Sequence, residues 1–183
     1  GVFQYSEGRF ARWPPAAELP STRVYDMAEG PLGELYFGTG AGVAGYVEGT
    51  WRHWNRPTPL RASQAFAIDV APDGTVWFAD RYRGVGRVEG DSITYYTGSD
   101  VLPNDEVWDV LVDADSTVWA STQGGLARYV HGQWITLGSD VGVPRSPLWP
   151  LAFADGRLYV GTMSLGAVVI DLAAAQANAP VIM

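Results

Sequence analysis

A glycine that opens an apolar strand recurs along this chain at an almost constant spacing. It stands at Gly1, Gly42, Gly84, Gly125 and Gly166, which are 41, 42, 41 and 41 residues apart. A turn glycine recurs at Gly8, Gly49, Gly90 and Gly132, and an aromatic residue recurs at Tyr36, Trp77, Trp119 and Tyr159. A fixed period of this length indicates a repeat architecture, in which each unit buries its faces against its neighbours.

One repeat can be followed strand by strand from Val107 to Leu137. Residues 107–112 form a short apolar run, residues 117–122 are β-branched and aromatic, and residues 125–130 and 133–137 follow after glycine breaks. Short runs bounded by turn residues are typical of β-strands. Four antiparallel strands in about 40 residues make one propeller blade, so the sequence predicts an all-β propeller of four-stranded blades.

A second aromatic column falls on the first strand of each repeat, at Tyr25, Phe66, Trp108 and Trp149. Large flat side chains at a fixed place in every unit suit the stacking of one blade on the next. We therefore interpret both aromatic columns as packing between blades.

The repeats divide the single propeller region, residues 1–183, into blades. Residues 1–21 supply the last two strands of a blade, and whole blades follow at 22–64, 65–106 and 107–147. Residues 148–172 form a partial blade, and the tail, 173–183, reads as a short helical turn or a linker. The partial blades at the two ends of the chain would then both contain a third strand, so they do not combine simply into one complete blade. The alternatives are imperfect closure on four blades or, as we prefer, a segment of a larger ring of about six to eight blades.

The composition excludes several classes of function. A formal charge of −8 argues against nucleic acid and against an anionic membrane surface, and no apolar stretch has the length of a membrane span. The chain has no cysteine, and its 12 basic residues are all arginines. A thiol nucleophile, a cysteine-ligated zinc, a Schiff-base amine and a P-loop lysine are therefore excluded. We expect no cofactor and no bound metal.

The repeat resembles that of the two-component regulator propellers, which reads roughly D-G-x-(L/V)-W-(V/F)-G-T followed by G-(L/V)-x-R-(Y/F). The first half appears at 33–39, 73–80, 115–122 and 155–162, and the second half appears at 125–129 and more loosely at 84–88. Departures fall at Ser116 in place of Gly and at Ala79-Asp80 in place of Gly-Thr. The resemblance implies an extracytoplasmic sensor region of a bacterial signalling protein, or a secreted or surface protein that binds ligands or partners.

Residues 71–80 are also similar to the propellers of the virginiamycin B lyase type. That resemblance implies catalysis by histidines, a carboxylate and a magnesium ion in the central region. This chain contains only His53, within an expected outer strand, and His131, in the turn before one. Within these residues, the chain therefore lacks the catalytic groups that the lyase class uses.

The link Arg81-Tyr82-Arg83 stands out among the loops, because its counterparts in the other repeats carry no charge. Arginine donates in a planar fork and tyrosine stacks, so the three residues are candidates to hold a carboxylate or a sugar. The alternative is a solvated loop whose arginines pair with neighbouring acids.

Asp26 and Asp109 occupy one column of the innermost strands, which line the axial channel of a propeller. They are candidate ligand-binding residues, and the alternative is that both simply face channel water. Asp113 and Asp115 have the spacing of a calcium loop without its later ligands, so we assign them to an Asx turn.

The leading functional hypothesis is a non-catalytic, extracytoplasmic propeller that is secreted, periplasmic or on the cell surface. It would bind a small molecule, a glycan or a protein on the face that carries the long connections 55–64, 97–106 and 138–147, without inserting into a membrane. The rest of a larger propeller or multidomain chain is a further expected partner. The alternatives are a lyase or lactonase whose catalytic residues are lost or lie elsewhere, and an accessory subunit of an assembly.

Overall fold

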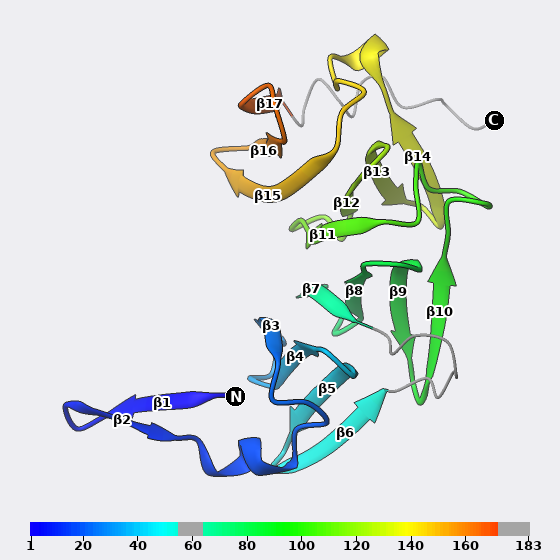
Figure 1. Ribbon diagram of the computed structural model, residues 1–183. Coiled ribbons are helices and arrows are strands. Elements are labelled where there is room, and N and C mark those ends of the chain that lie inside the picture. Colours follow the sequence, from blue (N-terminus) through cyan, green and yellow to red (C-terminus); the bar gives the residue numbers. More distant parts are fainter. Residues whose placement is uncertain (55–63, 172–183) are drawn as a thin grey trace.

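The computed structural model describes residues 1–54 and 64–171, which form five antiparallel sheets along an open arc (Figure 1). In each blade the first strand lies on the concave side of the arc and later strands lie progressively farther out. The predicted all-β propeller architecture is confirmed. The part of the connection at 55–63 and the tail beyond 171, for which the sequence suggested a loop and a helical turn or linker, lie outside the described residues.

The strands follow the repeat in chain order. The N-terminal hairpin comprises β1 (Phe3–Ser6) and β2 (Arg9–Arg12), followed by the 3-10 helix η1 (Pro14–Glu18). Blade 1 comprises β3 (Val24–Glu29), β4 (Leu35–Thr39), β5 (Gly42–Val47) and β6 (Thr50–Trp54). Blade 2 comprises β7 (Ala65–Val70), β8 (Val76–Asp80), β9 (Gly84–Glu89) and β10 (Ser92–Tyr96).

The second half of the arc repeats the same order. Blade 3 comprises β11 (Val107–Val112), β12 (Val118–Thr122), β13 (Gly125–Val130) and β14 (Gln133–Leu137), followed by the 3-10 helix η2 (Ser139–Val141). Blade 4 comprises β15 (Leu148–Ala154), β16 (Arg157–Thr162) and β17 (Ala167–Asp171). The strands expected between 107 and 137 are thus confirmed. No helix among the described residues is long and apolar enough to cross a membrane.

Two kinds of glycine explain the periodic columns. In the turn between β13 and β14, His131 and Gly132 both have positive φ, 51° and 81°, the combination required by the tight turns that match strand twist. At the start of β9, Gly84 has φ 86°, and a Cβ placed there would lie 1.9 Å from the carbonyl oxygen of Tyr96. Only glycine fits at Gly84, because any side chain would displace the backbone of the outer strand.

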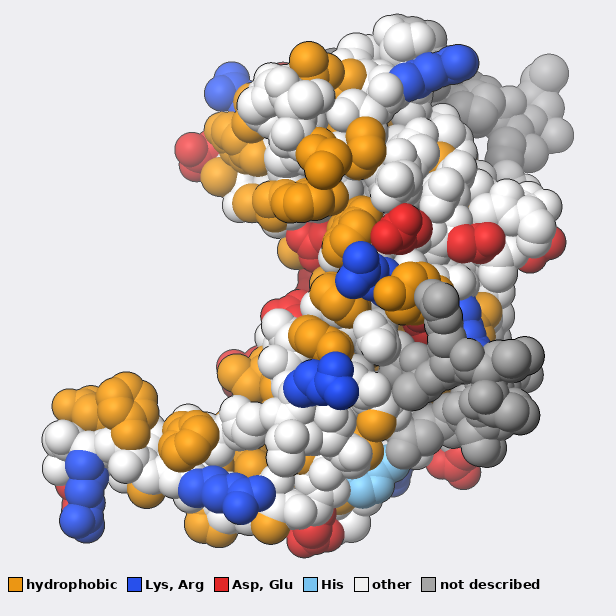
Figure 2. Space-filling view, in the orientation of Figure 1, with side chains coloured by type: hydrophobic (Ala, Val, Ile, Leu, Met, Phe, Trp, Pro, Cys, Tyr) orange, Lys and Arg blue, Asp and Glu red, His pale blue; other side chains and the backbone are white. Residues whose placement is uncertain are grey.

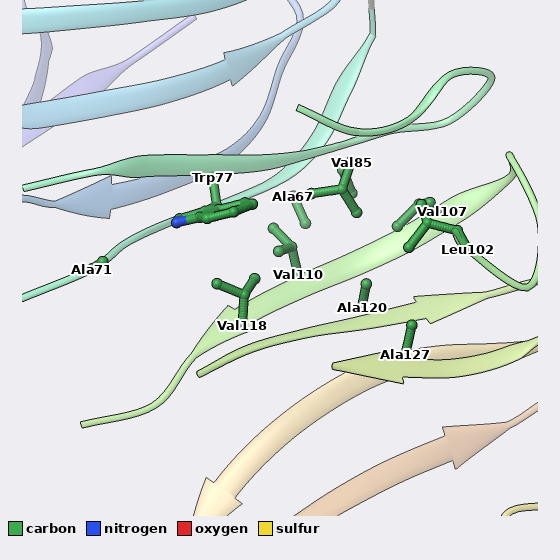
Figure 3. Close-up of a cluster of buried hydrophobic side chains, with 11 residues drawn as sticks. Ala67, Ala71, Trp77, Val85, Leu102, Val107, Val110, Val118, Ala120 and Ala127 are labelled. Carbon is green, nitrogen blue, oxygen red and sulfur yellow. The ribbon is translucent and has the colours of Figure 1, made fainter. Parts of the chain in front are cut away.

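Three buried clusters fill the three junctions between blades. The cluster between blades 2 and 3 places Trp77 and Val85 against Val110 and Val118 (Figure 3). Tyr36 belongs to the cluster between blades 1 and 2, and Trp119 to the cluster between blades 3 and 4. Three residues of the second-strand column, Tyr36, Trp77 and Trp119, therefore pack between blades as the sequence predicted, whereas Tyr159 of blade 4 lies outside the three clusters. Burying each such side chain stabilises its junction by roughly 2 to 3 kcal/mol.

Candidate ligand-binding pocket

The innermost strand of every blade carries a β-bulge. On β3 the pairing skips Tyr25, because its two neighbours pair with consecutive residues of β4. The residues at these bulges are Tyr25 on β3, Phe66 on β7, Trp108 on β11, and Trp149 with Pro150 on β15. A bulge twists a strand locally and re-aims the side chain of the extra residue. The first-strand aromatic column is therefore displaced from the regular ladder of each sheet.

The four displaced rings form a continuous row, which we call the aromatic ladder: Tyr25, Phe66, Trp108 and Trp149. Successive ring centroids are 4.4 Å, 6.1 Å and 5.5 Å apart, and the first pair is stacked at 14°. Tyr25 is 36% exposed and Trp149 is 42% exposed. The rings do touch across blades, but they lie outside the three buried clusters. The prediction that this column packs between blades is therefore confirmed, although the rings pack outside the buried clusters and Tyr25 and Trp149 stay partly exposed.

A cavity of about 340 Å³ opens beside the aromatic ladder on the concave side of the arc. We call it the axial pocket, and its lining comprises Asp26, Phe66, Ala67, Trp108, Asp109, Trp149 and Pro150. These residues come from the bulges and the next position on β3, β7, β11 and β15. Figure 2 shows hydrophobic side chains interleaved with acidic and basic ones along the concave side. The pocket therefore combines aromatic walls with carboxylates.

The axial carboxylates connect neighbouring blades. Asp109 accepts a hydrogen bond of 2.9 Å from the N–H of Val110 on its own strand and one of 2.7 Å from the N–H of Leu151 on β15. Asp26 accepts in the same way from Met27 and from Ile68 on β7, at 2.8 Å and 2.9 Å. Both predicted axial aspartates thus have a structural role at a blade junction as well as a place in the pocket.

Asp69 on β7 makes the equivalent connection at the remaining junction. Its carboxylate accepts hydrogen bonds from the N–H of Val70 at 2.8 Å and of Val112 on β11 at 2.7 Å. Sequence reasoning missed Asp69, because it lies two positions farther along its strand than the column of Asp26 and Asp109. The sequence feature that could have identified Asp69 is that it is the one charged residue in the apolar run 65–70.

Burial dominates the ionisation of this group of carboxylates. Loss of solvation raises the pKa of Asp109 to about 6, against the opposing effect of its two backbone hydrogen bonds. Burial likewise raises the pKa of Asp69. Repulsion from Asp26 adds to both shifts. The axis therefore concentrates negative charge that is only partly solvated.

Arg81, in the link between β8 and β9, lies over the aromatic ladder. Its Cζ is 4.7 Å from the ring centroid of Trp108 and 5.4 Å from that of Phe66. Its Nε lies 3.6 Å from a carboxylate oxygen of Glu106, just before β11. Arg81 thus bridges blades 2 and 3. Glu106 was not predicted, since nothing in its own repeat position distinguishes it.

The other two residues of the predicted Arg81-Tyr82-Arg83 site are less central. Tyr82 is 39% exposed, and its ring centroid lies 5.4 Å from the Cζ of Arg81. Arg83 is half-buried, and its N–H donates to the carbonyl of Asp80. Asp26 and Asp109 therefore line the axial pocket, whereas Arg81, Tyr82 and Arg83 all fall outside its lining. Of these three, Arg81 lies over two rings that line the pocket, those of Phe66 and Trp108.

The turn acids and the histidines lie away from this pocket. The Asp113 carboxylate accepts hydrogen bonds from the N–H groups of Asp115 and Thr117, which confirms the Asx turn. His53 is on the outer strand β6, and His131 is in the β13–β14 turn, as predicted. Across residues 1–54 and 64–171, no three histidine, aspartate or glutamate side chains gather closely enough to hold a metal ion.

Comparison with known proteins shows which solved structures share this fold. No protein-family model matches the chain, and no curated protein matches its sequence. Among solved structures, the extracellular domain of a hybrid two-component system from B. thetaiotaomicron has a TM-score of 0.69 at 18% identity, over 95% of this chain and 23% of that one. Virginiamycin B lyase from Staphylococcus aureus has a TM-score of 0.64 at 16% identity, over 90% of this chain and 60% of that one.

The computationally designed Ika4 protein is also similar, with a TM-score of 0.62 at 13% identity over 85% of this chain and 94% of that one. This chain therefore spans about a quarter of the two-component domain and about three fifths of the lyase. The resemblances to regulator propellers and to lyase propellers are both confirmed at the level of fold. The chain is a β-propeller of four-stranded blades, similar in architecture to an extracellular domain of a two-component system.

Proposed function

We propose that this chain is a ligand-binding propeller, the sensor or scaffold part of an extracytoplasmic bacterial protein. The observation that carries the proposal is the axial pocket, in which partly exposed aromatic rings lie beside two carboxylates on the innermost strands of blades 1 and 3. Ligand sites are typically concave, largely apolar and equipped with a few fixed polar groups. The blades hold these groups rigidly, because each axial carboxylate is bonded to two backbone N–H groups.

The sensor part of the proposal is supported by the similarity to an extracellular domain of a two-component system. At 18% identity that similarity concerns architecture, so the pocket supplies the argument for binding. The similarity to virginiamycin B lyase likewise concerns architecture. The lyase alternative is less favoured, because both histidines of this chain lie on outer parts of blades 1 and 3.

A ligand-observed NMR screen tests the proposal. Neutral sugars, short peptides, organic anions and organic cations are mixed in turn with the wild type, Trp149→Ala and Phe10→Ala. We expect at least one class to bind the wild type and to bind Trp149→Ala about tenfold more weakly, because an exposed ring that contacts the ligand is lost. Phe10 is a matched control, since it is an exposed aromatic residue of the hairpin, outside the pocket.

Two outcomes would count against this function. One is that no class binds, or that each class binds all three proteins equally. The other is a stoichiometric divalent ion in the purified protein by metal analysis, which would favour the metal-dependent lyase alternative.

A further inference from the structure

The aromatic ladder already holds one cation. The guanidinium of Arg81 lies over the rings of Trp108 and Phe66, within the range at which the negative face of an aromatic ring attracts positive charge. The ladder continues from these two rings to Trp149, which is 42% exposed. Ring surface of the same kind is therefore available beside Arg81 for a second cation.

The charge within the axial pocket has the opposite sign to that of Arg81. Its lining contains two charged residues, Asp26 and Asp109, and both are acidic. Each carboxylate oxygen accepts one backbone N–H, which fixes its position and leaves acceptor capacity. The net charge of −8 further favours the approach of a cation over an anion.

We propose that the axial pocket binds a small organic cation, an amine or a quaternary ammonium, between the aromatic ladder and the carboxylates of Asp26 and Asp109. This inference rests on the ligand-binding function proposed above and names the class of ligand. A cavity of about 340 Å³ has the volume of a small-molecule site. Arg81 is then a neighbouring positive charge, because its guanidinium lies over Trp108, a ring that also lines the pocket.

Binding of a cation should depend on pH through Asp109. The acids that act on its carboxylate are Asp26 on β3 and Asp69 on β7, while the residues it contacts on β12 and β15, Ser121 and Leu151, carry no charge. Burial raises the pKa of Asp109 to about 6, so its carboxylate is mostly ionised at pH 7.5 and mostly protonated at pH 5. A bound cation favours the ionised form, and affinity therefore falls as the pH falls through 6.

Choline and its neutral isostere 3,3-dimethylbutan-1-ol are suitable probes, with acetate as an anion, in ligand-observed NMR titrations. We expect choline to bind at pH 7.5 at least about tenfold more tightly than the isostere, because the isostere lacks the charge that rings and carboxylates attract. Lowering the pH to 5 should weaken choline binding and leave isostere binding unchanged.

Two pairs of variants sharpen the test. Asp109→Asn should weaken choline binding and abolish its pH dependence, whereas Asp69→Asn, which removes an equivalent carboxylate outside the pocket lining, should leave most of the affinity. Arg81→Gln removes a positive charge that repels a cation in the neighbouring pocket, so choline affinity should rise on the order of threefold. An anion held by Arg81 would instead bind Arg81→Gln more weakly.

The outcomes separate this inference from the proposed function. Equal binding of choline and the isostere, or acetate binding that is lost in Arg81→Gln, overturns the cation inference while ligand binding stands. Failure of choline to bind also overturns it, and the sugar and peptide arms of the broader screen then decide whether the pocket binds any ligand.

Discussion

Three aspartates show how single residues determine the geometry of this arc. Asp26, Asp69 and Asp109 each bond the N–H of the following residue and an N–H of the next blade, so every junction between blades has one such connection. A hydrogen bond to a charged group contributes about 1.5 to 3 kcal/mol. Burial of the carboxylates opposes this gain, as the raised pKa values of Asp69 and Asp109 indicate. These aspartates thus fix neighbouring blades relative to each other, while their carboxylates lose part of their solvation.

Replacing Asp109 by asparagine should change how stability depends on pH. Burial raises the pKa of Asp109 from 3.8 to about 6, so the folded protein retains a proton that the unfolded chain has released. The free energy of unfolding contributed by this group therefore falls as the pH rises from 4 to 7, by on the order of 1 to 2 kcal/mol after allowance for solvent screening. Urea denaturation of wild type and Asp109→Asn across this range measures the difference.

Asp73 provides a control of opposite sign. Hydrogen bonds from Thr75 lower the pKa of Asp73 below 3.8, so its contribution is present above that value and is lost as the pH falls below it. Asp73→Asn should therefore leave the pH dependence between 4 and 7 unchanged. A wild-type curve parallel to that of Asp109→Asn over this range would contradict the assignment.

At the scale of the strand, large and small residues are matched across pairs. Phe78 on β8 pairs with Gly86 on β9, and in blade 3 the equivalent pair is Ala120 with Ala127. A Cβ on Gly86 would lie 2.1 Å from the ring of Phe78, which is fully buried. In blade 2 the glycine on one strand thus leaves room for the large buried ring on the other, as close packing requires.

This matching predicts strong coupling between Phe78 and Gly86. Gly86→Ala should destabilise the wild type by about 1 to 3 kcal/mol, because the added methyl group overpacks the strand pair. In a Phe78→Ala background the same change should cost little, since the pair then equals Ala120 with Ala127. Denaturant unfolding of the four proteins in a double-mutant cycle measures the coupling, and additive effects would argue against the matched pair.

At the scale of the whole molecule, stability is a sum over neighbouring blades, each joined to the next by one buried cluster and one axial carboxylate. The innermost strands are sheet edges, whose inward N–H groups would otherwise lack a partner in the sheet. The carboxylates provide acceptors for some of these groups. Amide exchange along the inner strands therefore reports on each junction separately.

Hydrogen exchange should show that each axial aspartate protects one particular amide of the next blade. In Asp109→Ala the amide of Leu151 should lose protection while that of Val112 retains it, because Val112 donates to Asp69. Asp69→Ala should give the reciprocal pattern. Exchange measured by NMR on both variants provides the check, and equal loss at both amides in each variant would indicate global opening instead.

Much of this architecture could be predicted from the sequence alone. Glycine spacing and alternating apolar strands predicted the blades, because turn geometry and strand pairing depend on residues close together in the chain. The buried column of Tyr36, Trp77 and Trp119 was predicted for the same reason. The candidate pocket was predicted only in part: Asp26 and Asp109 were identified, whereas Trp108 and Trp149 were assigned to packing between blades alone.

Only the tertiary structure decided what the inner strands present to the axis. A bulge depends on the register between two strands, and strand composition does not reveal it, so the position of Trp108 outside the regular β11–β12 pairing was not predictable. The partner of Asp109, the Leu151 N–H, belongs to the next blade, 42 residues away in sequence. The sequence by itself determined a repeating β-blade; the packing of one blade on another decided which of its rings and carboxylates face a common pocket.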